Sequence, residues 1–219
     1  MSHDVTTVNI DRYADRVSTS ARPYHHGNLR AALVEAGVEL ARTSGPDGVV
    51  LREVARRTGV SHNAAYRHFA DRDELLGEIA SLAAGQLEEA MQRRLDEVRD
   101  TDPAERSRAR LRATGRAYVE FALAEPGLFH VAFCPLEVDD PTAMADSGPY
   151  VLLGQVLDEM LEAGVVSPEG RAGADVACWA GVHGLSVLLL DGPLRGLPAA
   201  DREAVLTKLL ATIEGGLTG

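Results

Sequence analysis

The chain is poor in cysteine and in aromatic side chains, and it has no long apolar run. Its 219 residues include two cysteines, Cys134 and Cys178, and aromatic residues make up 5%. Two cysteines are too few for a disulfide framework, so we expect two reduced, packed thiols. No run of about 18 apolar residues indicates a transmembrane helix, and the first residues lack the pattern of a secretory signal. The sequence therefore predicts a cytoplasmic protein without membrane contact.

Motifs that indicate catalysis are also missing. The sequence has no P-loop, no GxSxG, no HExxH and no Gly-rich dinucleotide turn. His130 and Cys134 have the i, i+4 spacing of a ligand pair but lack an obvious third ligand. His25 and His26 are adjacent, so their side chains diverge. We therefore expect no catalytic residues, no cofactor and no metal.

Apolar residues recur at helical spacing along the chain, and no stretch alternates as a β-strand does. Hydrophobic residues make up 45% of the sequence, enough for a folded core. We expect an all-α fold of about nine helices. The expected helices cover residues 28–43, 51–58, 61–69, 72–98, 104–124, 128–134, 150–163, 168–190 and 199–215, with a long loop at 135–149. The expected domains are a flexible arm at 1–23, a small helical head at 24–71 and a larger helical body at 72–219.

Charge is divided unevenly along the chain. The formal net charge is -11, which by itself disfavours a nucleic-acid partner. Residues 22–70, however, hold seven arginines and four acids, a balance of +3, whereas residues 71–219 hold 13 basic and 26 acidic side chains, a balance of -13. A basic head on an acidic body is typical of a phosphate-binding unit carried by a scaffold.

Residues 51–69, LREVARRTGVSHNAAYRHF, have the pattern of two short helices joined by a tight turn. Gly59 suits the left-handed residue that ends the first helix, and Ser61 suits the N-cap of the second. Val50 stands where Ser or Thr would cap the first helix, which costs about 1 kcal/mol. The pattern predicts a helix-turn-helix whose second helix can enter the major groove of DNA.

A long helix is expected directly after this unit. Asp71 and Glu74 have capping-box spacing, with Asp in place of Ser or Thr, so the helix would start at about Arg72. Its apolar stripe would comprise Leu75, Ile79, Leu82, Ala83, Leu87, Met91 and Leu95. We expect this helix to bridge the head and the body.

The expected second helix of the helix-turn-helix carries residues suited to DNA. Asn63 lies in its first turn and can pair bidentately with adenine, while Ala64 is small enough for close approach to a thymine methyl group. The other side chains offer donors to phosphate oxygens. The predicted DNA-binding residues are Arg52, Ser61, His62, Asn63, Ala64, Tyr66, Arg67 and His68. The alternative is an ordinary pair of packed surface helices.

Residues 25–79 resemble the DNA-binding domain of TetR/AcrR-type transcriptional regulators. The resemblance rests on LREVARRTGVS, on AAYRHF and on the DRDELL entry to the long helix. It implies a homeodomain-like three-helix head in which Tyr66 and His68 hold phosphates and Phe69 packs in the core. The sequence departs from the family pattern at Val50, where the family often has a Ser or Thr that touches phosphate.

The body is similar to a branch of this family with a Trp-His-Gly signature, here Trp179, His183 and Gly184. The resemblance implies a helical ligand-binding and dimerisation domain, with an unidentified small-molecule effector. Aromatic side chains with a few polar groups also suit such a pocket. The predicted pocket residues are Tyr118, Phe121, Phe129, Phe133, Trp179 and His183. The alternative is an ordinary core that contains a hydrogen-bonded histidine.

The last two expected helices are the candidate dimer elements. Gly181, Gly184 and Ser186 leave room for close helix approach. The final helix has an apolar surface too wide for one seam, formed by Val205, Leu206, Leu209, Leu210 and Ile213. We expect a homodimeric repressor of a near-palindromic double-stranded DNA operator, released by a small-molecule effector. The alternative is a ligand-binding or protein-interaction module of the same fold that has lost specific DNA binding.

Overall fold

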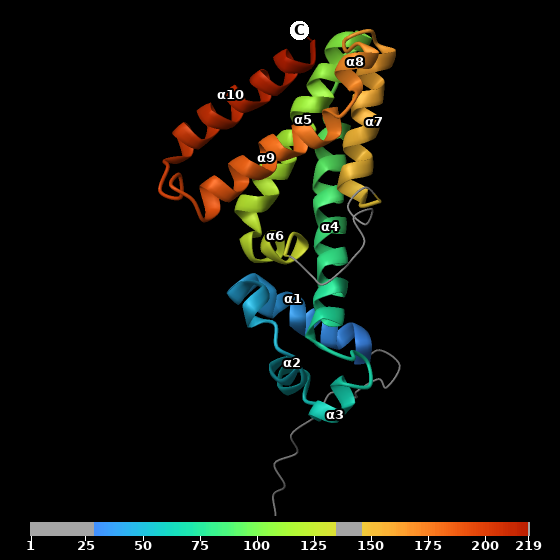
Figure 1. Ribbon diagram of the computed structural model, residues 1–219. Coiled ribbons are helices and arrows are strands. Elements are labelled where there is room, and N and C mark those ends of the chain that lie inside the picture. The colour runs from blue at the N-terminus through green and yellow to red at the C-terminus, as the bar shows by residue number, and fades with distance from the viewer. Residues whose placement is uncertain (1–28, 135–145, 219) are drawn as a thin grey trace, which may run out of the picture.

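The computed structural model describes residues 29–134 and 146–218, which form ten α-helices (Figure 1). The helices are α1 (Leu29–Gly48), α2 (Leu51–Thr58), α3 (His62–Ala65), α4 (Arg72–Asp96), α5 (Pro103–Ala124), α6 (Pro126–Ala132), α7 (Gly148–Glu162), α8 (Pro168–Arg171), α9 (Ala174–Leu190) and α10 (Ala199–Thr218). No strand occurs within these two ranges, and the predicted all-α fold is confirmed. The predicted arm and residues 135–145 of the predicted loop lie outside the described residues. None of the helices in these ranges is both long and apolar enough to cross a membrane.

The head consists of α1, α2 and α3. The main part of α1 ends before Gly45, whose φ of 63° interrupts the helix, close to the predicted end at residue 43. The bounds of α2 are those predicted. The three helices enclose a small core in which Leu33, Val54 and Phe69 are fully buried. Burial of such side chains stabilises each by about 1.5–3 kcal/mol relative to exposure.

The long helix α4 starts at Arg72 as predicted and runs from the head into the body (Figure 1). Asp71 accepts a hydrogen bond from the Glu74 N–H over 2.8 Å, and the Glu74 carboxylate accepts one from the Ala70 N–H over 2.7 Å. This reciprocal arrangement satisfies two donors at the helix start. One residue of the predicted stripe is wrong: Leu82 is 47% exposed, while Leu76 is buried.

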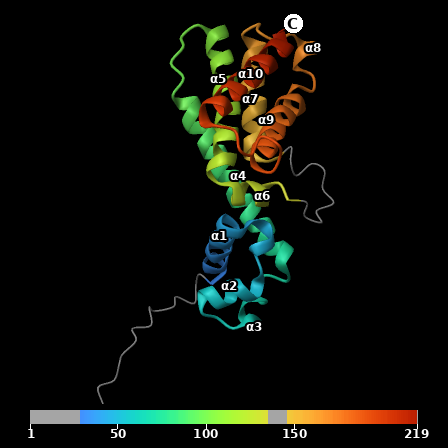
Figure 2. The same cartoon turned by 90° about the vertical axis from the view of Figure 1, so that its left-hand side faces the viewer.

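The body is built around α4 and α5, which pack against each other, and α5 also contacts α7, α9 and α10. Helices α9 and α10 lie on the side of the body that faces the viewer in Figure 2. The short helix α6 lies between the body and α1 (Figure 1). A Cβ atom at Gly127 would overlap the carbonyl oxygen of Ala41, and Arg42 Nε lies 3.1 Å from Glu125 Oε2. Helix α6 is therefore in tight contact with the head.

Three predicted helices differ from those observed. The helix predicted at 61–69 is observed only as the four-residue α3, and a turn follows it at residues 66–68. The helix predicted at 168–190 is two helices, α8 and α9, because Gly173 between them takes a left-handed φ of 73°. Helix α6 begins earlier than predicted, at Pro126. Proline lacks the N–H that the first turn of a helix leaves unpaired, so Pro126 starts α6 as well as following the end of α5.

Candidate DNA-binding face and ligand cavity

The turn between α2 and α3 has the predicted geometry. Gly59 has a φ of 71°, and the N–H of Val60 donates to the Ala55 carbonyl over 3.0 Å. The Ser61 hydroxyl oxygen accepts from the Ala64 N–H over 3.2 Å and caps α3. Val50 makes no side-chain cap to α2. Ala65 is completely buried, which fixes the rotation of α3 and turns its neighbouring residues outward.

The structure brings the predicted DNA-binding residues together on α3, the turn after it and the adjoining α2, at the end of the head farthest from the body (Figure 1). Exposed residues are Arg52, Ser61, His62, Asn63, Tyr66 and Arg67, and half-buried ones are Ala64 and His68. The His62 and Tyr66 rings meet edge to face, with centroids 4.5 Å apart. Within the described part of the chain, the side chains of Arg52, Asn63 and Arg67 have no hydrogen bond or ion pair, so their donors are available to a partner.

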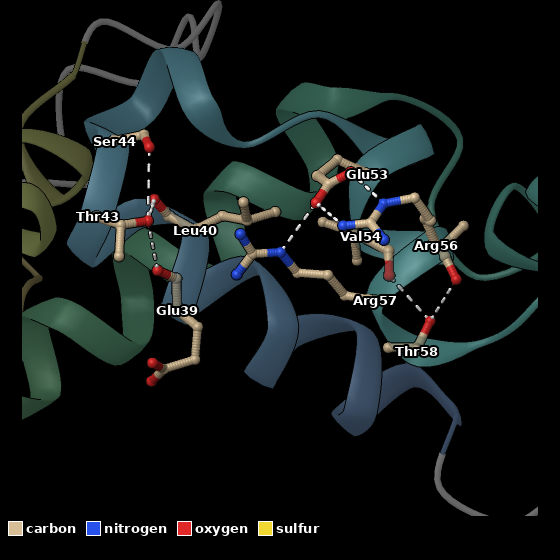
Figure 3. A network of polar contacts seen from close by, with 10 residues as sticks. Glu39, Leu40, Thr43, Ser44, Glu53, Val54, Arg56, Arg57 and Thr58 are labelled. Atoms are coloured by element: carbon tan, nitrogen blue, oxygen red, sulfur yellow. Dashed lines mark hydrogen bonds and ion pairs between the residues drawn. The ribbon is translucent and has the colours of Figure 1, made fainter.

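Most arginines of the head are already paired with carboxylates. Arg56 and Arg57 both bind Glu53, with Nε–O distances of 2.7 and 3.0 Å (Figure 3). These hydrogen bonds lower the pKa of Glu53 to about 2. The other ion-paired arginines are Arg30, with Glu74 and Glu78, and Arg42, with Glu39 and Glu125. The charge balance of +3 counted from the sequence therefore overstates the positive charge that is available to bind phosphate. Arg52 and Arg67 carry most of the positive charge that remains available.

Two arginines that were not predicted as site residues hold the helix-turn-helix in place. The Arg30 guanidinium lies 4.3 Å from the centre of the Phe69 ring and donates to the His68 carbonyl, which ties α1 to the residues after α3. Arg72 donates to the carbonyls of Val49 and Pro46 over 2.9 and 2.7 Å. It thereby fixes the segment that leads into α2. No sequence signal marks these contacts, since the partners lie 23 to 38 residues away.

The body contains a cavity of about 770 Å³ between α4, α5, α7, α9 and α10. Of the six predicted pocket residues, Tyr118, Phe133, Trp179 and His183 line it. Phe129 lies behind the lining, with its ring centre 5.4 Å from that of His183. Phe121 instead borders a separate groove beside α4 and α5. Tyr150, Cys134 and Cys178 also line the cavity but were not predicted.

A hydrogen-bonded chain of three aromatic side chains forms one wall of the cavity. The Trp179 Nε1–H donates to the Tyr118 hydroxyl oxygen over 2.9 Å, and that oxygen lies 2.9 Å from His183 Nδ1. Within the described residues, Nδ1 is the acceptor offered to the Tyr118 hydroxyl hydrogen. Pairing of that hydroxyl hydrogen with Nδ1 requires the tautomer that carries the imidazole proton on Nε2. Burial lowers the pKa of His183 and raises that of Tyr118, so both are neutral.

The potential metal ligands of the body have other roles. His130 Nε2 lies 2.8 Å from Asp191 Oδ2. Cys134 and Cys178 are free thiols, and burial raises the pKa of Cys178 to about 11. In the described ranges, no group of three or more His, Cys, Asp or Glu residues is arranged so that it could hold a metal ion.

A helix-turn-helix head joined to an all-helical body with a cavity defines a class of bacterial regulators. The profile described as "Bacterial regulatory proteins, tetR family" matches residues 33–79, and "Tetracyclin repressor-like, C-terminal domain" matches residues 111–213. A protein of unknown function from Rhodococcus sp. RHA1 is 31% identical, with a TM-score of 0.73 over 91% of this chain and 100% of that chain. The chain belongs to the TetR family. The Trp-His-Gly branch stays a prediction.

Curated relatives are regulators of transcription. An HTH-type transcriptional repressor of Mycobacterium tuberculosis is 32% identical over 57 residues, 26% of this chain and 30% of that protein. The chain thus matches less than a third of the length of this relative. An uncharacterized HTH-type transcriptional regulator of Bacillus subtilis, YobS, is 24% identical over 74% of this chain and 80% of that protein. The chain is therefore a homologue of HTH-type transcriptional regulators.

Two solved structures share the fold at lower identity. The regulator FadR from Bacillus subtilis, in complex with stearoyl-CoA, is 16% identical over 85% of this chain and 98% of that chain, with a TM-score of 0.64. A TetR variant from Acinetobacter baumannii AYE, in complex with minocycline, is 20% identical over 85% of this chain and 94% of that chain, with a TM-score of 0.58. At these identities the likeness concerns the fold.

Proposed function

We infer that the protein is a ligand-responsive repressor, which binds a near-palindromic operator as a homodimer and is released by a small-molecule effector. The observation that carries this function is the face of α2 and α3. Its side chains Arg52, Asn63 and Arg67 are exposed and unpaired in the described part of the chain, while neighbouring arginines are neutralised. A DNA duplex supplies the phosphates and base edges that such a face can bind.

Asn63 is the proposed base-reading residue. It is exposed in the first turn of α3, where side chains of a recognition helix reach base edges. Ala64 beside it allows close approach to the groove. The remaining polar side chains of the face would hold phosphates, and these are Arg52, Ser61, His62, Tyr66, Arg67 and His68. Phosphate contacts set position and affinity, whereas Asn63 would set preference for adenine.

Exposed apolar residues on α9 and α10 support the proposed dimer. Val176, Val187 and Leu188 on α9 and Val205 on α10 are 37–56% exposed. A Cβ atom at Gly184 would meet nothing within 4 Å, so α9 has open space there. A two-fold related copy would cover these side chains and present two recognition helices to successive major grooves.

The small residues predicted at the dimer contact divide between two roles. A Cβ atom at Gly181 would lie 3.0 Å from Ile213 Cδ1, so Gly181 lets α10 of the same chain approach α9. Ser186 is buried, and its hydroxyl donates to the Val182 carbonyl over 2.8 Å. Of the three, Gly184 is thus the one we assign to the partner copy.

The effector would act through α4 and α6. Phe133, at the end of α6, lines the cavity, while Gly127, at its start, touches the backbone of α1. A ligand that favours one placement of α6 would shift the two heads relative to each other. It can do so only by binding the two states with different affinity. Other proteins of this fold accept stearoyl-CoA and minocycline, which supports a ligand role for the cavity.

Fluorescence anisotropy with duplexes from around the protein's own gene tests DNA binding. The expected result is specific binding that weakens steeply with salt, because phosphate contacts release counterions. Binding of every duplex at the same weak level would contradict an operator-specific repressor. It would favour the alternative module that has lost specific DNA binding.

A further inference from the structure

The hydrogen-bonded chain in the cavity ends in a donor. In the tautomer whose Nδ1 accepts from Tyr118, the proton of neutral His183 lies on Nε2, and this atom has no hydrogen bond in the described part of the chain. No buried side-chain nitrogen or oxygen of these residues lacks a partner. Nε2 is therefore accessible rather than sealed in the core, and His183 lines the cavity. A molecule in the cavity can accept a hydrogen bond from it.

The rest of the lining is nearly free of charge. Arg112 is the one Lys, Arg, Asp or Glu side chain on the described wall. Its Nη1 lies 2.6 Å from Glu214 Oε2, and Glu214 is also paired with Arg108 over 3.2 Å. Because Glu214 already neutralises Arg112, the wall in the described ranges carries no unpaired cation that would offset the desolvation of an anionic ligand. A neutral ligand leaves the pair intact.

The other titratable groups on the wall favour a neutral ligand as well. Cys134 and Cys178 are thiols whose pKa burial raises, and burial raises the pKa of Tyr118 and Tyr150. These groups are uncharged at neutral pH. The remaining lining is apolar, with Leu111, Leu153 and Leu210 among its members. An apolar ligand would gain binding free energy here, because its apolar surface and that of the wall are both removed from water.

We propose that the effector is a largely apolar, uncharged molecule whose carbonyl oxygen accepts a hydrogen bond from His183 Nε2–H. The proposal rests on the proposed function, in which this cavity is the effector site. Trp179 and Tyr118 act as positioning residues, since they fix the tautomer that makes His183 a donor.

The protein contains one tryptophan, and Trp179 lines the cavity, so its fluorescence reports occupancy. Three probes of equal carbon number separate the alternatives: methyl nonyl ketone, undecanoic acid and undecane. The ketone is expected to bind about fivefold more tightly than undecane, the value of one hydrogen bond. Undecanoic acid, which is ionised at neutral pH, is expected to bind at least about tenfold more weakly than the ketone.

Two variants isolate the donor. His183→Phe keeps a ring but removes the Nε2–H, so it should bind ketone and undecane equally. His183→Gln places an amide N–H near the position of Nε2 and should restore most of the preference for the ketone. Unchanged thermal unfolding of each variant would show that the fold is kept.

The outcomes are distinct. Equal or tighter binding of the acid in the wild-type protein overturns the neutral class, and a ketone preference that survives His183→Phe overturns the donor. Binding of none of the three probes overturns the proposal altogether. Operator binding is measured separately by anisotropy. The result with the three probes therefore does not decide whether the protein binds DNA.

Discussion

Val50 and Ser61 occupy equivalent positions, each directly before a helix of the head, but only Ser61 satisfies a backbone N–H with its side chain. Val50 has the extended conformation of an N-cap residue, with a φ of -123° and a ψ of 126°, and its side chain is 47% exposed. A hydroxyl could therefore replace one methyl group of Val50 without a steric conflict or the loss of a buried contact.

Val50→Thr should raise the free energy of unfolding by about 1 kcal/mol, because the threonine oxygen can accept from the first turn of α2. Urea unfolding of the whole chain measures the change. Ser61→Ala is the matched control and should lower the free energy of unfolding by a similar amount, because it removes an existing cap. A Val50→Thr protein that is no more stable than the wild type would show that another group already accepts hydrogen bonds from the backbone N–H groups in the first turn of α2.

Asn63→Ala should weaken operator binding by about 1–3 kcal/mol and relax preference at one base pair. The reason is that Asn63 offers both a donor and an acceptor to adenine, while the fold does not use its side chain. Competition anisotropy against duplexes with single base changes measures the preference. Tyr66→Phe is the control, since loss of a phosphate contact should weaken binding to all duplexes alike. If Asn63→Ala keeps the base preference of the wild type, Asn63 does not read a base.

The sequence carried different amounts of information about different elements. Helix α2 was predicted at its observed bounds because Gly59 and Ser61 are strong local signals. The break at Gly173 was missed because a glycine within an apolar helical pattern does not reveal its φ. Leu82 was misplaced because it lies at the edge of the stripe on α4, where spacing alone cannot tell which side faces the body.

Gly127→Ala should destabilise the protein, because the added methyl group would overlap the α1 backbone, which cannot move as a side chain can. Overpacking of this kind costs about 1–3 kcal/mol, and operator affinity should change as α1 shifts. The control is Gly85→Ala on α4, where an added Cβ meets nothing within 4 Å and a small gain in helix stability is expected. Urea unfolding and anisotropy provide the two measurements. If Gly127→Ala has the same stability and operator affinity as Gly85→Ala, α6 is not in tight contact with α1.

The whole molecule separates the proposed DNA-binding end from an acidic body. Helix α3 lies at one end of the structure and α10 at the other (Figure 1), so the negative charge of residues 71–219 is largely held away from DNA. This division was predictable from charge counts. The pairing of Arg30 with Glu78 and of Arg42 with Glu125 was not, because the partners come from helices distant in sequence. Likewise, the concentration of aromatic residues and the family resemblance identified residues near the cavity but not which of them reach its wall.

The proposed dimer makes a prediction that belongs to the whole assembly. Gly184→Leu adds a bulky side chain where the single chain has open space, so the fold of each copy should survive. A partner packed closely against α9 would be pushed away. The dissociation constant of the dimer should rise at least about tenfold, or about 1.4 kcal/mol, and operator affinity should fall with it because two linked heads bind successive grooves.

Analytical ultracentrifugation measures the dimer, and Gly85→Leu is the matched control. Gly85 is also a helical glycine with nothing within 4 Å of an added Cβ atom, but it lies on α4 rather than on the α9 and α10 face. It should remain dimeric. A Gly184→Leu protein that dimerises like the control would place the contact on another surface. The exposed side chains of Val176 and Leu188 would then need a different partner, since water alone is an unfavourable neighbour for a continuous apolar face.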